Sequence, residues 1–206
     1  MPEPVSSGRT LVLASGNPGK LGEITAMLNP LGWHVAPQGD WNVPDAVEDG
    51  LSFVENALIK ARHAARLTGL PALADDSGLA VDALDGAPGI YSARYAGGGG
   101  DQANTRKLLE ALADVPDEKR GAHFYCAMAL VHHETDPAPL IAIGRWDGTI
   151  SRAPRGQGGF GYDPVFFVPE KGCTSAELPG EVKNTMSHRG LALQAMVRLI
   201  RDEPGV

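Results

Sequence analysis

The sequence predicts an α/β fold with a mixed β-sheet and flanking helices, and two observations support this class. Short apolar runs that are typical of buried strands alternate with segments of helical periodicity along the chain. The connections between these segments are of two kinds, since some resemble strand–helix–strand crossovers and others resemble antiparallel hairpins. A length of 206 residues is enough to form a substantial core, and we expect one domain spanning residues 1–206.

The first elements follow from the order of apolar, small and helix-breaking residues. Thr10–Ala14 is an apolar run that predicts a buried strand. The turn after it leads into a helix, because Pro18 suits a first helical turn and the pattern continues to about Leu28. A short strand is expected near Trp33–Ala36, followed by a polar loop over Pro37–Gly50.

A longer helix is predicted over Phe53–Thr68, with signals at both ends. Ser52 and Glu55 have the spacing of a capping box, in which each side chain satisfies a backbone N–H group of the first turn. Gly69 and Pro71 then end the helix.

Strands are more frequent in the rest of the chain. Ala72–Ala74 and Leu79–Leu84 are expected to be two strands on either side of an Asp75–Gly78 turn. A glycine-rich loop, Gly97–Gly100, comes before the next helix. The remaining elements are predicted as a helix near 102–113, strands at 122–132, 140–150 and 164–168, and a final helix from about 188 to 201.

The chain is acidic overall, and its charge is unevenly distributed. The formal net charge of −7 excludes a protein that coats DNA or RNA, because such proteins need a basic surface. Residues 40–85 carry nine acidic and three basic side chains, so most of the negative charge lies in this stretch. A solvated acidic surface explains many such stretches, and a divalent-metal site is the alternative.

Neither export nor membrane insertion is expected. The first residues do not combine a basic region with a long apolar one, and no apolar run approaches the ~20 residues that span a bilayer. Cys126 and Cys173 form no CxxC pair, which argues against a cysteine zinc site or a disulfide scaffold. We therefore expect a cytoplasmic protein with no membrane partner.

Two glycine patterns bear on nucleotide binding. The strand, turn and helix over 11–24 present helix N-terminal N–H groups and Lys20, which suit a phosphate, although a simple tight turn is the alternative. The spacing of Gly16, Gly19 and Lys20 is not that of a Walker P-loop. The glycines of 156–161 match a dinucleotide fingerprint by letter but open no helix, so we reject that interpretation.

Carboxylates and a lysine form a second candidate site. Asp75 and Asp76 are adjacent, and Glu48 lies in a loop upstream that could converge on the same metal ion. An ordinary aspartate-rich turn is the alternative. Lys60 lies four residues after Asn56, so the two share one helix face, although a surface lysine is also common.

A third group of residues suits a nucleobase. Ser187 is a candidate N-cap, and His188 and Arg189 in the first helical turn oppose the helix dipole unless an anion or an electron-rich base offsets them. With Lys183 nearby, this segment indicates a nucleotide contact, a surface pair being the alternative. Residues 160–163 (FGYD) add an aromatic ring for stacking and a carboxylate that can accept from purine N–H groups.

Taken together, these segments resemble the inosine triphosphatase family, the pyrophosphatases of non-standard purine nucleoside triphosphates. The match extends from Leu11 to Leu199. Its five ordered blocks are SGNPGK (15–20), EDGLSFVENALIKA (48–61), ADDSGLAVDALDGAPGIYSARYAG (74–97), GGFGYDPVF (158–166) and SHRGLAL (187–193). The set is far more specific than any single block.

The resemblance implies a fold, a reaction and an assembly. The fold is an elongated mixed sheet with flanking helices and two lobes around a central nucleotide-binding cleft, usually in a homodimer. The reaction is Mg²⁺-dependent hydrolysis of ITP, dITP and XTP to the nucleoside monophosphate and pyrophosphate. This activity removes deaminated purines from the nucleotide pool.

The family's residue roles carry over to the matching positions. Contacts with the triphosphate are implied for Ser15, Gly16, Asn17, Pro18, Gly19, Lys20 and the catalytic Lys60. Glu48, Asp75 and Asp76 are implied at the metal, with Asp76 also the base. Ser77 is implied to contact the substrate, and the base pocket is implied to contain Phe160, Gly161, Tyr162, Asp163, Lys183, His188 and Arg189.

Two other functions remain open. One is a pyrophosphatase acting on other modified nucleotides, including pyrimidines, and the FGYD and SHR segments argue against it. The other is a non-catalytic nucleotide sensor, which has no need for the three carboxylates at a hydrolytic metal site.

Overall fold

A computed structural model describes residues 9–15 and 18–203 of the chain. It divides into two compact units, and we describe each by itself. Unit 1 comprises residues 1–76, 127–142 and 193–206, and unit 2 comprises residues 77–126 and 143–192. Gly16 and Asn17, which the sequence places in the phosphate turn, lie outside the described residues.

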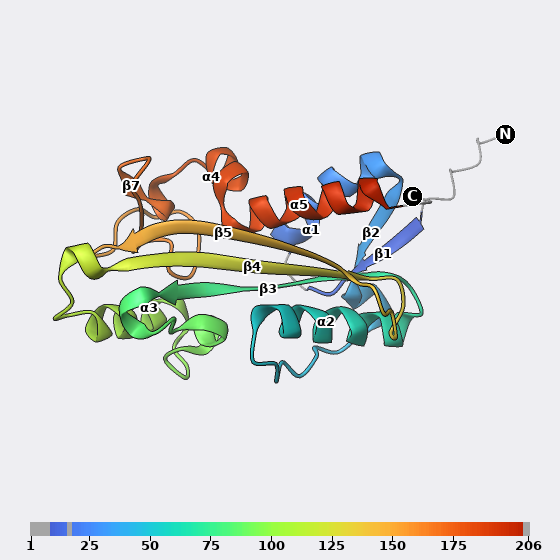
Figure 1. Cartoon of the computed structure of the whole chain (residues 1–206), viewed down its shortest axis with the longest axis horizontal. Helices are drawn as coiled ribbons and strands as arrows, with labels where there is room; N and C mark the ends of the chain where they lie inside the picture. The colour runs from blue at the N-terminus through green and yellow to red at the C-terminus, as the bar shows by residue number, and fades with distance from the viewer. Residues whose placement is uncertain (1–8, 16–17, 204–206) are drawn as a thin grey trace. The chain divides into compact units, whose positions relative to one another are not determined.

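The elements form a mixed α/β structure, which confirms the predicted fold class. The strands are β1 (Arg9–Leu13), β2 (Trp33–Pro37), β3 (Ala72–Val81), β4 (Gly121–Val131), β5 (Leu140–Ile150), β6 (Phe166–Val168) and β7 (Cys173–Thr174). The α-helices are α1 (Pro18–Leu28), α2 (Phe53–Thr68), α3 (Gly100–Ala111), α4 (Gly180–Met186) and α5 (His188–Asp202). One seven-stranded sheet has the order β2-β1-β3-β4-β5-β6-β7 (Figure 1).

In unit 1, β1 is the organising strand. It pairs in parallel with β2 on one side and with β3 on the other. In Figure 1, α2 covers one face of these strands, while α1 and the second half of α5 lie on the other face. The helix α2 presents Ala57, Ala61 and Ala64, which are fully buried, so small side chains let it pack closely.

In unit 2, aromatic rings form the centre of the core. Phe124 of β4 lies 4.6 Å from Phe166 of β6, and Trp146 of β5 lies 5.1 Å from Phe166, between ring centroids. The strands β5 and β6 pair antiparallel through Ile150 and Phe166. Tyr162, one of the candidate nucleobase residues, belongs to this core.

The structure corrects one sequence prediction and adds one helix. The expected pair of strands around an Asp75–Gly78 turn is a single strand, β3. A strand can pass through two aspartates here because lysine side chains compensate both carboxylates, as described below. The short helix α4, Gly180–Met186, has no counterpart among the sequence predictions.

No helix in the described part of the chain has the length and apolar character needed to span a bilayer. Cys126 and Cys173 are both free thiols.

The Ser52 cap of α2 is present as predicted and provides a stability test, but the Glu55 carboxylate accepts from the Leu51 N–H instead of the Ser52 N–H that a capping box requires. The Ser52 hydroxyl accepts from the Glu55 N–H at 3.2 Å, and the Glu55 carboxylate accepts from the Leu51 N–H at 3.0 Å. Ser52→Ala is expected to lower the free energy of unfolding by about 1 kcal/mol. Chemical denaturation checks this, with Asp49→Ala in the same exposed loop as the control. Equal effects of the two substitutions would contradict the capping role.

Candidate active site

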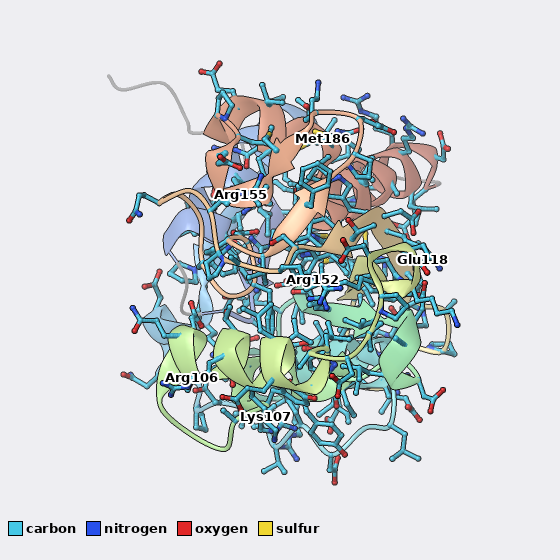
Figure 2. All side chains as sticks on the ribbon, turned by 90° about the vertical axis from the view of Figure 1, so that its left-hand side faces the viewer. Arg106, Lys107, Glu118, Arg152, Arg155 and Met186 are labelled. Carbon is cyan, nitrogen blue, oxygen red and sulfur yellow. The ribbon has the colours of Figure 1, made fainter. Side chains whose placement is uncertain are left out.

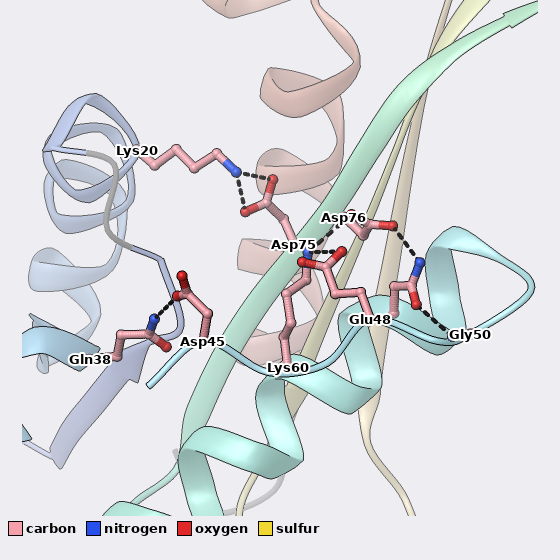
Figure 3. A network of polar contacts seen from close by, with 9 residues as sticks. Lys20, Gln38, Asp45, Glu48, Gly50, Lys60, Asp75 and Asp76 are labelled. Atoms are coloured by element: carbon pink, nitrogen blue, oxygen red, sulfur yellow. Dashed lines mark hydrogen bonds and ion pairs between the residues drawn. The ribbon is translucent and has the colours of Figure 1, made fainter. Parts of the chain in front are cut away.

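In unit 1, Lys60 lies at the centre of a network of carboxylates (Figure 3). Its Nζ lies 3.0 Å from Asp76 Oδ1 and 3.3 Å from Glu48 Oε2. Asn56, one turn earlier on α2, donates from Nδ2 to Asp76 Oδ2 at 3.2 Å. The helical spacing of Asn56 and Lys60 therefore aims both side chains at one carboxylate of β3.

A second ion pair joins α1 to β3. Lys20 Nζ lies 2.8 Å from both carboxylate oxygens of Asp75, whose side chain is only 2% exposed. Since neighbouring side chains on a strand point to opposite faces, Asp75 and Asp76 meet different lysines. Figure 3 shows Lys20 and Lys60 reaching the strand from different helices.

The Asn56 side chain also fixes the loop that carries Glu48. Asn56 is 1% exposed, and its Oδ1 accepts from the Gly50 N–H at 2.9 Å. A Cβ at position 50 would lie 2.7 Å from that oxygen, so the loop requires glycine for this approach. In the sequence, Asn56 stands out only as a neighbour of Lys60 on one helix face, and their four-residue spacing is the signal that indicates a shared role.

Burial and charge shift the protonation of this network. Burial raises the pKa of Asp76, and the ion pair with Lys60 only partly offsets that effect. Burial lowers the pKa of Lys60, but Asp76, Glu48 and Asp75 together outweigh it and leave that pKa above its ordinary value. Lys60 therefore stays charged near neutral pH, while Asp76 is a stronger base than an exposed aspartate.

A cavity of about 240 Å³ opens onto these residues. Ser15, Lys20, Glu48, Lys60 and Asp75 are among the residues that line it. Lys20 and Lys60 therefore line the same cavity as the carboxylates of Glu48 and Asp75. Such a cavity suits an anion that is accompanied by a cation.

The carboxylates of this network suit a divalent cation that takes few ligands from the protein. The described residues contain no preformed cluster of three or more metal-binding side chains. Glu48 and Asp76 nevertheless converge on one cation, the Lys60 ammonium. Mg²⁺ commonly takes one or two carboxylates and completes its shell with water and substrate phosphates, so this arrangement suits Mg²⁺ better than a metal needing a full protein cage.

In unit 2, Asp163 organises the turn over 160–163. Its Oδ2 accepts from the Phe160 N–H at 2.8 Å and from the Lys183 ammonium, and its Oδ1 accepts from the Ser175 hydroxyl at 2.8 Å. The residue is only 3% exposed. These partners already engage both oxygens, so Asp163 holds Phe160 and Lys183 in place.

Tyr162 is an anchor of the same turn. It is 3% exposed, and its hydroxyl donates to the Ser92 carbonyl at 2.8 Å. Burial raises the pKa of this hydroxyl far above its usual range. Tyr162 therefore stays neutral and fixes the turn in the core.

Phe160 differs from its neighbours in the turn because it is exposed. Two cations lie near its ring. Lys183 Nζ is 5.2 Å and the Arg189 guanidinium carbon 5.5 Å from the ring centroid. His188 is buried, and its imidazole stacks on Phe124 at 4.7 Å with an interplanar angle of 13°. Ser187 caps α5 as predicted, because its hydroxyl accepts from the Gly190 N–H at 3.2 Å.

The structure thus gathers the predicted residues into two clusters, one in each unit. Pro18, Gly19 and Lys20 begin α1, and Ser15 is the last described residue before this helix. Ser77 is half-buried on β3 as the first residue of unit 2.

Comparison with known proteins identifies the relationship of the whole chain. A model of the Ham1 family matches residues 11–199. The chain belongs to the Ham1 family. The matched range agrees with the extent of the resemblance predicted from the sequence blocks, which is thereby confirmed.

Ham1 relatives of this chain have known names and structures. A dITP/XTP pyrophosphatase from Yersinia pestis is 57% identical over 193 residues, covering 93% of this chain and 98% of that protein. A HAM1 protein from Coxiella burnetii has a solved structure that is 50% identical, with a TM-score of 0.91 and coverage of 95% of this chain and 100% of its own. The structure of a nucleoside-triphosphatase and dITP/XTP pyrophosphatase from Mycobacterium abscessus is 47% identical, with a TM-score of 0.78, and covers 93% and 100% of the two chains.

Proposed function

We propose that this chain hydrolyses non-standard purine nucleoside triphosphates, namely ITP, dITP and XTP, to the nucleoside monophosphate and pyrophosphate. Its Ham1 family membership and relatives named dITP/XTP pyrophosphatase over nearly the whole chain support this activity. The structural observation that carries the proposal is the Lys60 network, in which one lysine lies between Glu48 and Asp76 beside the Lys20–Asp75 pair. The biological role is removal of deaminated purines from the nucleotide pool.

Lys20 and Lys60 are the groups that bind the triphosphate. Phosphoryl chemistry depends mainly on positioning and on neutralising the charge of the phosphate oxygens. Both ammonium groups border the same cavity in unit 1, and the N-terminus of α1 supplies backbone N–H groups near Lys20. Ser15 and Gly19 belong to the same phosphate-binding turn in this proposal.

Mg²⁺ is the proposed cofactor, and Glu48, Asp75 and Asp76 are the residues that would hold it. When bound, it would supply further neutralisation of charge on the phosphate oxygens. Lys20 contacts both oxygens of Asp75, while Lys60 contacts one oxygen each of Glu48 and Asp76, and each carboxylate has acceptor capacity beyond these contacts.

Asp76 is the proposed general base. It accepts a proton from the attacking water as the oxygen of that water adds to phosphorus and the α–β anhydride bond breaks, releasing pyrophosphate. The raised pKa of its carboxyl group favours this proton transfer. Asn56 and Lys60 hold the two carboxylate oxygens in a defined orientation for it.

The residues around Phe160 are proposed to select the base. Inosine and xanthine present O6 where adenine has an amino group, so donors such as Lys183, His188 and Arg189 favour the oxo edge. A base with the wrong edge leaves buried donors unpaired, which can reduce binding strongly. Gly161 belongs to the same turn, which Asp163 and Tyr162 anchor through the Phe160 N–H and the Ser92 carbonyl.

Assays of pyrophosphate release test the proposal and its alternatives. The substrates are ITP, dITP, XTP, ATP, GTP and modified pyrimidine triphosphates, each with Mg²⁺ and with excess chelator. We expect release from the first three only, and only with the metal. Preferential turnover of modified pyrimidines would favour the broader pyrophosphatase, and nucleotide binding without turnover would favour a sensor.

Phe160→Ala tests the stacking role. Stacking of a base on an aromatic ring contributes about 1–3 kcal/mol, so we expect the KM for ITP to rise by about 5- to 150-fold with a smaller change in kcat. Tyr91→Ala, which removes another exposed aromatic side chain of unit 2, is the control. An unchanged KM for ITP in Phe160→Ala would remove Phe160 from the base pocket.

We further propose that residues 1–206 act as one domain, in a cytoplasmic homodimer. Continuity of the strands supports the single domain, because β3, β4 and β5 each include residues of both units.

Light scattering on the purified chain tests the dimer, and a monomeric mass at micromolar concentration would contradict it.

A further inference from the structure

The helix α3 contacts the turn that carries Phe160 through two hydrogen bonds, one to the N–H and one to the carbonyl of Gly161. Asp101 Oδ2, in the first turn of α3, accepts from the Gly161 N–H at 2.7 Å. Thr105 Oγ1, one helical turn later, donates to the Gly161 carbonyl at 3.3 Å. The N–H belongs to the Phe160–Gly161 peptide and the carbonyl to the Gly161–Tyr162 peptide, so α3 fixes the peptide planes on both sides of Gly161.

Gly161 is the residue of this turn with the greatest conformational freedom. Its φ of +61° lies in the left-handed region, which glycine enters at little cost and from which it can also leave easily. Phe160 precedes it directly, so rotation at Gly161 changes the direction of the Phe160 ring relative to the anchored Tyr162. The hydrogen bonds from Asp101 and Thr105 restrain both peptide planes and so limit rotation at Gly161.

The turn is open to a hollow beside α3. Residues of α3 and of the segment 154–164 line this hollow of about 730 Å³, and both Phe160 and Gly161 are among them. Phe160 is 58% exposed. Figure 2 looks onto α3, which carries Arg106 and Lys107, and onto the segment that carries Arg155. Leu108 of α3 and Tyr162 of the turn belong to one buried core cluster, and the hydrogen bonds to Gly161 are the polar link between helix and turn beside the hollow.

We infer that Asp101, assisted by Thr105, is a positioning residue for the Phe160 ring and thereby for the purine of the substrate. The inference rests on the proposed function, since it assigns a support to the base pocket of that reaction. Asp101 touches neither substrate nor reacting atoms in this role, so its loss affects binding of the base more than the chemical step.

Kinetics of Asp101→Ala test this inference, with Glu110→Ala as the matched control. Glu110 is an exposed carboxylate of the same helix that lines the same hollow. We expect Asp101→Ala to raise the KM for ITP about fivefold with kcat unchanged within about twofold, which is typical of one lost charge-assisted hydrogen bond at the surface. Asp101→Asn keeps an acceptor oxygen and should restore most of the affinity. Equal KM values for Asp101→Ala and Glu110→Ala would overturn the inference.

A double-mutant cycle with Phe160→Ala separates positioning from a general structural effect. If Asp101 acts through Phe160, then Asp101→Ala should have no further effect on KM once the ring has been removed. An equal effect in both backgrounds would show that Asp101 acts elsewhere and would overturn the inference.

Hydrogen exchange keeps this test distinct from the test of the proposed function. In the nucleotide-free protein, we expect faster amide exchange in the peptide covering 160–163 for Asp101→Ala and not for Glu110→Ala. Unchanged exchange would overturn the inference even if ITP were a substrate. If the wild-type chain failed to hydrolyse ITP, the proposed function would fail while exchange still reported whether Asp101 holds the turn.

Discussion

Asp76→Asn is expected to lower kcat for ITP by about 10²–10⁴-fold while the KM stays within about threefold of the wild-type value. The amide has nearly the shape of the carboxylate but cannot accept a proton from water at neutral pH. Lys60 and Asn56 both donate to Asp76, and one amide oxygen still accepts from one of them, so the fold of β3 should persist. Pyrophosphate release and calorimetric titration of ITP in the presence of Mg²⁺ measure the two effects separately.

The control for this substitution is Asp82→Asn, which removes an exposed carboxylate directly after β3. It should leave both parameters unchanged. Turnover by Asp76→Asn within tenfold of wild type would assign the base to another group. A loss of nucleotide binding as large as the loss of kcat would show instead that Asp76 mainly holds the substrate.

Gly144→Ala is expected to have the second large effect, on both stability and base recognition. Position 144 of β5 lies directly under the first turns of α5, and an added Cβ would collide with the His188 carbonyl and lie 2.6 Å from the Ala192 nitrogen. Both obstacles are backbone atoms, so the helix must shift as a whole. Overpacking of this kind costs about 1–3 kcal/mol, and the shift also moves His188 and Arg189.

We therefore expect Gly144→Ala to lower the melting temperature by several degrees and to raise the KM for ITP about tenfold or more. Gly98→Ala is the matched control in unit 2, because a Cβ at Gly98 has no heavy atom within 4 Å. Thermal unfolding and steady-state kinetics on the same samples provide the measurement. If Gly144→Ala were as stable and as active as Gly98→Ala, the packing of α5 on β5 would have no part in forming the base pocket.

Local signals in the sequence predict much of this fold. The helix α2 begins and ends at the predicted residues because Ser52, Glu55 and Gly69 specify its two ends through contacts with near neighbours in the chain. The strands β1, β2 and β5 lie within one or two residues of their predicted bounds, because apolar runs bounded by polar turns define them. Where the prediction is wrong, at β3, the reason is long-range: Lys20 and Lys60 stabilise two aspartates in a strand, and neither lysine is close to them in sequence.

In the candidate site, too, motifs in the sequence predict some residues, while contacts between distant segments appear only in the structure. Motif resemblance names the lysines and carboxylates, and the structure joins Lys60 with Glu48 and Asp76. Sequence could not predict the contacts of Asp163 with Ser175 and Lys183, because these partners are 12 and 20 positions away, whereas its contact with the Phe160 N–H is local to the turn. The contact of Asp101 with Gly161 spans 60 positions and matches no motif, so only the folded chain reveals it.

Competition between ITP and ATP tests the central claim most directly. The wild-type chain is supplied with equimolar ITP and ATP and Mg²⁺, and ion chromatography quantifies nucleotides, phosphate and pyrophosphate over time. We predict that ITP disappears first, with one IMP and one pyrophosphate formed for each ITP consumed, while ATP persists. Equal consumption of the two nucleotides, or release of single phosphates from ITP, would contradict the account.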